Sequence, residues 1–144
     1  MNLASIVARV TFAALLASPA VLGGCRVLNK DKGATAMAER LDDAPAIRLE
    51  TLGDNHMLVM QAPNPGWSYR LDRDDRDRDG WIVFITIREP DPAFMYPQRI
   101  VDKRLLTEVE SDEPIRVMAR LLDHSEKGTK DQYALLGIAE PGTP

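Results

Sequence analysis

The chain has 144 residues, of which 44% are hydrophobic, 28% charged and 6% aromatic, proportions that suit one globular domain with a modest core. Its formal net charge is −4, from 18 Lys and Arg residues against 22 Asp and Glu residues, so a nucleic acid is not an expected partner, because phosphate binding needs a basic face. One cysteine excludes an internal disulfide, and two histidines are too few for a histidine-built zinc site.

The first predicted element is a short apolar segment near the N-terminus. No acidic residue precedes Asp31, and Arg9 is followed by an almost uninterrupted apolar run over residues 10–22. At about 1.5 Å per residue, a helix of this length spans only about 20 Å, short of the hydrocarbon thickness of about 30 Å. The segment therefore predicts the hydrophobic region of an export signal peptide and not a permanent transmembrane helix.

The apolar segment ends in Leu22-Gly23-Gly24-Cys25, which resembles the lipobox of bacterial lipoproteins. The resemblance implies that a signal peptide, residues 1–24, is cleaved after Gly24. It also implies that Cys25 carries a diacylglyceryl thioether and an acylated amine, so that membrane lipid is a partner held through two or three acyl chains. The alternative is an ordinary secretory signal followed by a free cysteine.

Residues 25–45 are expected to form the lipidated N-terminus and a flexible tether. They are mostly small and polar, and a coil of about 20 residues reaches about 25 Å. A short helix from Thr35 to Leu41 has too few apolar residues to bury much surface. Arg26 occupies the position at which an aspartate resembles an inner-membrane retention signal, so the sequence favours the outer membrane of a bacterial envelope, facing the periplasm.

From Ala46 onward the apolar period changes to two, which predicts β-strands. Strands are expected near residues 47–52, 57–60, 67–71, 81–87, 99–109, 115–121 and 133–139. The segment 81–87 is apolar on both faces and predicts a central strand. About seven short strands predict an all-β fold over residues 46–140, an immunoglobulin-like antiparallel sandwich, with a small β-barrel as the alternative and residues 141–144 as a tail.

The acidic segment 72–80 is the sharpest local motif. Asp75, Asp77 and Asp79, followed by a glycine, match the opening of a calcium-binding loop. However, Thr86 stands where such a loop needs a bidentate carboxylate, and arginines alternate with the acidic residues. The sequence therefore favours a solvated hairpin loop closed by an Asp-Gly pair, with a calcium-dependent or small-ligand binding module as the alternative function.

Two further groups contain residue types that bind ligands. His56, Met57 and Met60 suit copper, but a strand places only His56 and Met60 on one face, so core methionines are the preferred interpretation. Trp67 and Trp81 are interpreted as the edges of the core and not as a binding cleft. No metal and no cofactor is expected.

Candidates for catalysis are few. His124 lies between Asp123 and Ser125, residue types that suit a hydrolase triad, but neighbours in sequence rarely point at a common substrate and no nucleophile elbow is present. Cys25, the only thiol, would be acylated. The sequence therefore predicts a lipid-anchored envelope protein that is not an enzyme and whose β-sandwich has an interaction or structural role, with another envelope protein as its partner. A hydrolase that uses His124 is the third hypothesis.

Overall fold

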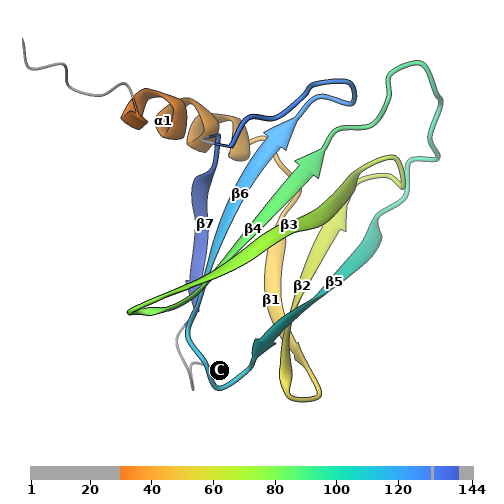
Figure 1. Ribbon diagram of the computed structural model, residues 1–144. Helices are drawn as coiled ribbons and strands as arrows, with labels where there is room; N and C mark the ends of the chain where they lie inside the picture. Colours follow the sequence, from red (N-terminus) through yellow and green to blue (C-terminus); the bar gives the residue numbers. More distant parts are fainter. Residues whose placement is uncertain (1–29, 131, 140–144) are drawn as a thin grey trace, which may run out of the picture.

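The computed structural model describes residues 30–130 and 132–139, and within them two β-sheets pack face to face with one helix at an end (Figure 1). The elements are α1 (Lys30–Leu41), β1 (Ile47–Leu52), β2 (Asn55–Ala62), β3 (Ser68–Asp77), β4 (Gly80–Arg88), β5 (Val101–Glu110), β6 (Ile115–Leu122) and β7 (Ala134–Ala139). The predicted β-sandwich is confirmed, and the sheets do not close into a barrel.

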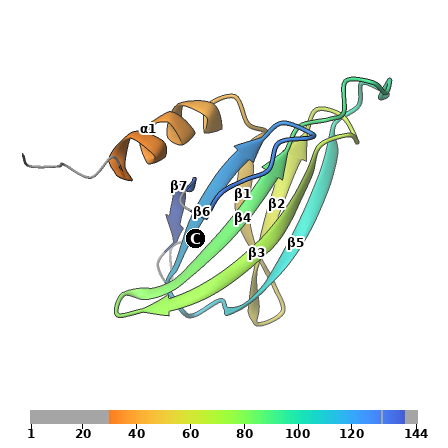
Figure 2. The ribbon, with the colours of Figure 1, turned by 45° about the horizontal axis from the view of Figure 1, so that its top comes forward.

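The two sheets have the orders β1-β2-β5 and β3-β4-β6-β7. All neighbouring strands are antiparallel except β4 and β6, which run in parallel. The parallel pair arises because β5, which lies between β4 and β6 in the chain, belongs to the other sheet. The chain runs back along β5 and returns along β6 in the direction of β4 (Figure 2). This pair departs from the wholly antiparallel sandwich that we expected.

The core lies between the sheets and follows the period of two along the strands. In β4 the side chains of Val83, Ile85 and Ile87 are fully buried in it, and in β2 those of Leu58 and Met60 face them. Burying a side chain of this size contributes about 1.5–3 kcal/mol, so these alternating positions provide most of the drive for the two sheets to pack.

Tyr69 of β3 joins the two sheets through its hydroxyl group. This oxygen lies 2.7 Å from the carbonyl oxygen of Leu58 in β2 and 2.8 Å from that of Lys103 in β5. Burial raises the pKa of the Tyr69 phenol to about 12. The phenol therefore stays protonated at neutral pH, and its single O–H proton is shared between these two carbonyl oxygens across the sandwich.

Helix α1 packs at the end of the sandwich near β6 and β7 (Figure 1). The short helix expected from Thr35 to Leu41 is present and begins at Lys30, so the prediction of a flexible tether that buries little is wrong for this segment. Met37 is only 3% exposed and belongs to the core. Its sulfur accepts the amide of Leu121 at 3.1 Å. Pairing between β6 and β7 ends at Ala119 and Ala134, so this amide has no strand partner on that side.

An ion pair fixes the last turn of α1 to the loop between β6 and β7. Arg40 donates two hydrogen bonds of 3.1 Å to Glu126 and one of 3.3 Å to Asp123. The hydrogen bond from Arg40 lowers the pKa of the Glu126 carboxyl group. At a pH above the pKa of Glu126 in the unfolded chain, this ion pair therefore stabilises the folded state. The stabilisation is lost as the pH falls through the lower pKa that Glu126 has in the folded state.

The charged segment that was expected to be a loop is mostly strand. Residues 72–77 continue β3 to Asp77, which pairs with Gly80, so the turn consists of Arg78 and Asp79 alone. Gly80 has a φ of +126°, and a Cβ atom there would lie 2.5 Å from the carbonyl oxygen of Pro114. β3 tolerates so much charge because it is an edge strand, where charged side chains reach solvent and discourage pairing with other chains.

Candidate functional site

The outer face of the four-stranded sheet carries an apolar groove of about 340 Å³, which we call the outer groove. It is lined by Ile82 and Phe84 of β4, Arg116 and Met118 of β6, and Leu135 and Ile138 of β7. These positions alternate with the core positions of their strands and therefore point away from the other sheet. β4 is central and apolar on both faces, as predicted, but its outer face is only partly covered.

The strand at the edge of this groove, β7, has no charged side chain. Its sequence is Ala-Leu-Leu-Gly-Ile-Ala, whereas the other edge strands, β1, β3 and β5, each carry charged residues. Leu135 and Ile138 of β7 are 53% and 61% exposed. Charged residues on an edge strand prevent further strands from adding to it. Among the described edges, β7 alone lacks this protection.

A second apolar hollow lies on the other side of β7, where the edges of the two sheets meet. This seam hollow has a volume of about 200 Å³ and is lined by Ile47, Leu49 and Arg48 of β1, Leu58 of β2, Val117 of β6 and residues 136–139 of β7. Gly137, near the middle of β7, has open space where a side chain would be. The edge of β7 that pairs with no strand of the described residues is thus flanked by an apolar depression on each face of its sheet, and helix α1 packs near this strand as well as near β6.

Beside the outer groove lies a buried polar cluster, which we call the Arg120 cluster. It consists of Asp72 on β3, Thr86 on β4, Arg120 on β6 and Tyr133 just before β7. Arg120 donates from Nε to Thr86 at 2.7 Å, and its terminal nitrogen Nη2 lies 3.4 Å from Asp72. The hydroxyl groups of Thr86 and Tyr133 also donate to the same Asp72 oxygen.

The loop between β6 and β7 covers the Arg120 cluster. Arg120 donates to the carbonyl oxygen of Thr129 at 2.8 Å, and its guanidinium group lies 4.6 Å from the ring centre of Tyr133. Gly128 packs directly against that guanidinium group, which leaves no space for a Cβ atom. Burial, followed by the hydrogen bond to Asp72, raises the pKa of Tyr133. Because the Asp72 carboxylate accepts from Thr86 and Tyr133 and pairs with Arg120, the cluster joins β3, β4, β6 and the segment just before β7.

Two of the three acidic residues proposed for a calcium loop, Asp75 and Asp77, have their carboxylates in ion pairs with arginines. Asp75 pairs with Arg73 at 3.0 Å, and Asp77 pairs with Arg116. The backbone amide of Asp79, and then Arg116, lower the pKa of Asp77. In the part of the chain that the structure describes, no group of three His, Cys, Asp or Glu side chains could hold a metal ion.

We expect calcium to change the melting temperature of the protein by less than about 1 °C between millimolar calcium and chelator. A specific site would add about 2.7 kcal/mol at a hundredfold excess over Kd, which is several degrees for a domain of this size. The ion would instead have to compete with the arginines that pair with Asp75 and Asp77. Differential scanning fluorimetry measures the shift, with magnesium at equal ionic strength as control. A rise specific to calcium and lost in Asp77→Ala would contradict this interpretation.

The histidine and methionine residues proposed for copper do not meet. His56 is 5% exposed, and its Nε2 lies 2.9 Å from the carbonyl oxygen of Glu113. Met60 is in the core between the sheets, whereas Met57 lies on the opposite face of β2. Both tryptophans, Trp67 and Trp81, pack against the core as partly buried residues.

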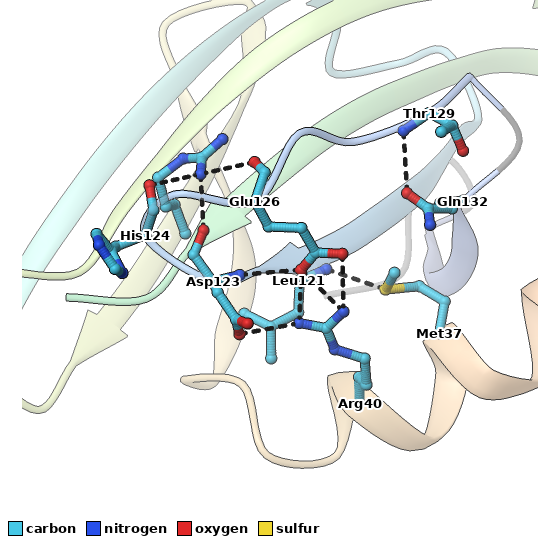
Figure 3. Close-up of polar contacts among 9 residues, drawn as sticks. Met37, Arg40, Leu121, Asp123, His124, Glu126, Thr129 and Gln132 are labelled. Atoms are coloured by element: carbon cyan, nitrogen blue, oxygen red, sulfur yellow. Dashed lines mark hydrogen bonds and ion pairs between the residues drawn. The ribbon is translucent and has the colours of Figure 1, made fainter. Parts of the chain in front are cut away.

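The structure does not assemble a triad around His124. The His124 ring lies 3.7 Å from Asp91, in the loop before β5, and not against its neighbour Asp123. Figure 3 shows the ring turned away from Asp123, whose carboxylate faces Arg40. In the loop between β6 and β7, which contains His124, the backbone carbonyl groups of Asp123, His124 and Glu126 accept hydrogen bonds from Arg88. The loop is therefore bound to the sandwich by structural contacts.

Cys25, Gly24 and the rest of the predicted lipobox lie outside the described residues. Within residues 30–130 and 132–139, no helix is both long and apolar enough to cross a membrane. No protein-family model, curated protein or solved structure matches the chain.

Proposed function

We propose that the chain is a lipoprotein of the bacterial envelope, anchored through acylated Cys25, whose β-sandwich is a non-enzymatic interaction domain that takes up an extended, uncharged strand at β7. One observation carries the interaction role: the uncharged edge of β7 has an apolar hollow on each face of the sheet. The residues of the lipobox support the anchor.

Strand addition suits this edge because it uses both the backbone polar groups of β7 and the apolar hollows on the two faces beside it. The N–H and C=O groups of β7 that face away from β6 would pair with the main chain of the incoming strand and give affinity. Alternate side chains of that strand would enter the outer groove and the seam hollow and give specificity. Because both depressions are mainly apolar, the matching segment is apolar on both faces.

The wall of the outer groove also contains an unsatisfied donor. The Nε of Arg116 is buried and has no hydrogen-bond partner within the described residues. Buried donors are nearly always paired in folded proteins, so an orphan in a groove wall favours an acceptor supplied by a partner. The ion pair of Arg116 with Asp77 balances its charge, which keeps this side of the groove suited to an uncharged ligand.

For the anchor, we expect Cys25→Ser to abolish partitioning into the detergent phase and to leave the unprocessed precursor, because lipidation and the cleavage that follows both require the thiol. Detergent-phase separation of cell extracts and the mass of the chain measure both effects. Ser111→Ala, a change far from the lipobox, serves as the control. Partitioning of Cys25→Ser equal to that of the wild type would contradict the lipoprotein assignment.

The interaction role is tested separately by a photo-crosslinking residue placed at Leu135 in the membrane-bound chain. An adduct of defined mass that forms from Leu135, and not from the similarly exposed Leu52 at the edge of β1, supports uptake of a strand at β7. The same adducts from both positions, or none from Leu135, would contradict it.

A further inference from the structure

We infer that the strand taken up at β7 is β7 of a second copy of this chain, paired antiparallel about a twofold axis, so that the protein is a dimer with one continuous sheet across the interface. This inference rests on the proposed function and names its partner. It rests on the uncharged, apolar sequence of β7 and on the charged side chains of the other edge strands, which make those strands unsuitable partners.

β7 itself is apolar on both faces, which is the property that the two apolar hollows favour in an incoming strand. Leu135 and Ile138 line the outer groove, while Leu136 lines the seam hollow on the other face. The strand is therefore apolar on both faces and six residues long. β1, β3 and β5 carry several ionic side chains that would have to enter mainly apolar hollows, so β7 is the strand of the described chain that fits them best.

Charge also permits two copies to meet at this strand. The whole chain has a formal net charge of −4, which would oppose self-association through most of its surface. β7 contributes no charge to the interface, and the nearby Arg116 is already paired with Asp77. Like charges directly opposite each other, which destabilise antiparallel pairs, are therefore absent along the two β7 strands.

The backbone of β7 allows close approach. Gly137 has nothing within 4 Å of the position of an added Cβ atom, so the face of the sheet is open at the middle of this strand. A glycine within a strand is typical of a place where another backbone comes near. The register between β6 and β7 shifts at Val117 and Met118, so that Leu135 and Ile138 both face the outer groove.

Pairing of two β7 edges would also stop at two copies. A twofold interface uses the same surface on both chains and is closed. The extended sheet would have the order β3-β4-β6-β7 in each half, meeting at the two β7 strands, and its new outer edges would be the two β3 strands. These edges carry alternating Asp and Arg residues, which discourage further addition.

The test is cross-linking of the full chain in its native membranes through Gly137→Cys, a position with room for the new side chain. We expect a short bis-maleimide to give a product of twice the mass of the chain. Thr51→Cys, on the exposed edge of β1, should give none. The chain without an introduced cysteine controls for reaction at Cys25, the only native thiol.

A second substitution shows whether the product depends on the β7 surface. Adding Ile138→Lys to the Gly137→Cys chain should reduce the product of doubled mass about tenfold. The two lysines would place like charges in the interface, and the apolar contact of Ile138 would be lost. Adding Leu52→Lys, at a similarly exposed leucine of β1, should leave it unchanged. Since Ile138 is 61% exposed, Ile138→Lys should leave the far-ultraviolet circular dichroism spectrum of the parent chain unchanged, which excludes unfolding as the cause.

The outcomes separate this inference from the proposed function. No doubled-mass product, or a product insensitive to Ile138→Lys, overturns the dimer. If, in addition, the Leu135 photo-adduct has the mass of this chain plus a different protein, the dimer is wrong and strand uptake at β7 still holds. If Leu135 gives no adduct either, both proposals are wrong.

Discussion

Replacing Arg120 with methionine is expected to lower the free energy of unfolding by about 3–5 kcal/mol, because it leaves a buried carboxylate without its buried cation. The side chains of Arg120 and Asp72 are only 9% and 12% exposed. The substitution also removes the donors to Thr86 and to the carbonyl oxygen of Thr129, so the loop above the cluster loses its attachment. Urea denaturation with linear extrapolation measures the change.

The matched control is Arg70→Met, which removes the other arginine that contacts Asp72. Arg70 lies 3.1 Å from the carboxylate but is 70% exposed, so its loss should cost less than about 1 kcal/mol. The double variant Asp72→Asn with Arg120→Met should be less destabilised than the sum of the single variants, because neither charge is then left alone. A cost for Arg120→Met no larger than that for Arg70→Met would contradict the importance assigned to the buried pair.

Met37→Ala is expected to cost about 2–3 kcal/mol, because it removes the core side chain through which α1 is attached to the sandwich. Met37 is 3% exposed, and its sulfur accepts the amide of Leu121, which would be left without a protein partner. The same urea titration measures the effect. Native-state hydrogen exchange should also show earlier opening of α1 and of the last residues of β6.

Met95→Ala provides the control for this substitution because it makes the same chemical change at a fully exposed side chain. Its effect should fall within about 0.5 kcal/mol of zero. If Met37→Ala were equally harmless, α1 would not contribute to the core. A chain that begins at Ala46 would then fold as well as the whole, as the prediction of a flexible tether implies.

The strands were predictable because their signal is local. Alternation of apolar and polar side chains and the turn residues between them depend only on neighbours in sequence, and the central place of residues 81–87 follows from apolar side chains on both faces. Helix α1 was underestimated because it has few apolar side chains. The burial of Met37 depends on β6, whose residue Leu121 is 84 positions away in sequence.

The candidate site was visible in the sequence only in part. The absence of charge in residues 134–139 can be read directly, but that β7 is an edge strand depends on the order of the sheet, which local patterns do not specify. The Arg120 cluster has no spacing that could have revealed it, since Tyr133 and Asp72 are 61 positions apart. Asp72 was read as part of a loop because charged edge strands and solvated loops have similar compositions.

The parallel pairing of β4 with β6 has a consequence for how the chain folds. The hairpins β1–β2 and β3–β4 join neighbours in sequence and can form early, as local contacts do. The β4–β6 pair joins Trp81 to Ile115, and it requires the chain to cross to the other sheet through β5 and return. That loop must close before the pair contributes any stability, so its formation should limit the folding rate. β7 can add only to a completed β6, so the chain passes through a state in which the growing sheet ends at β6. Substitutions in β5 should slow folding because they delay the β4–β6 pair that comes before this state.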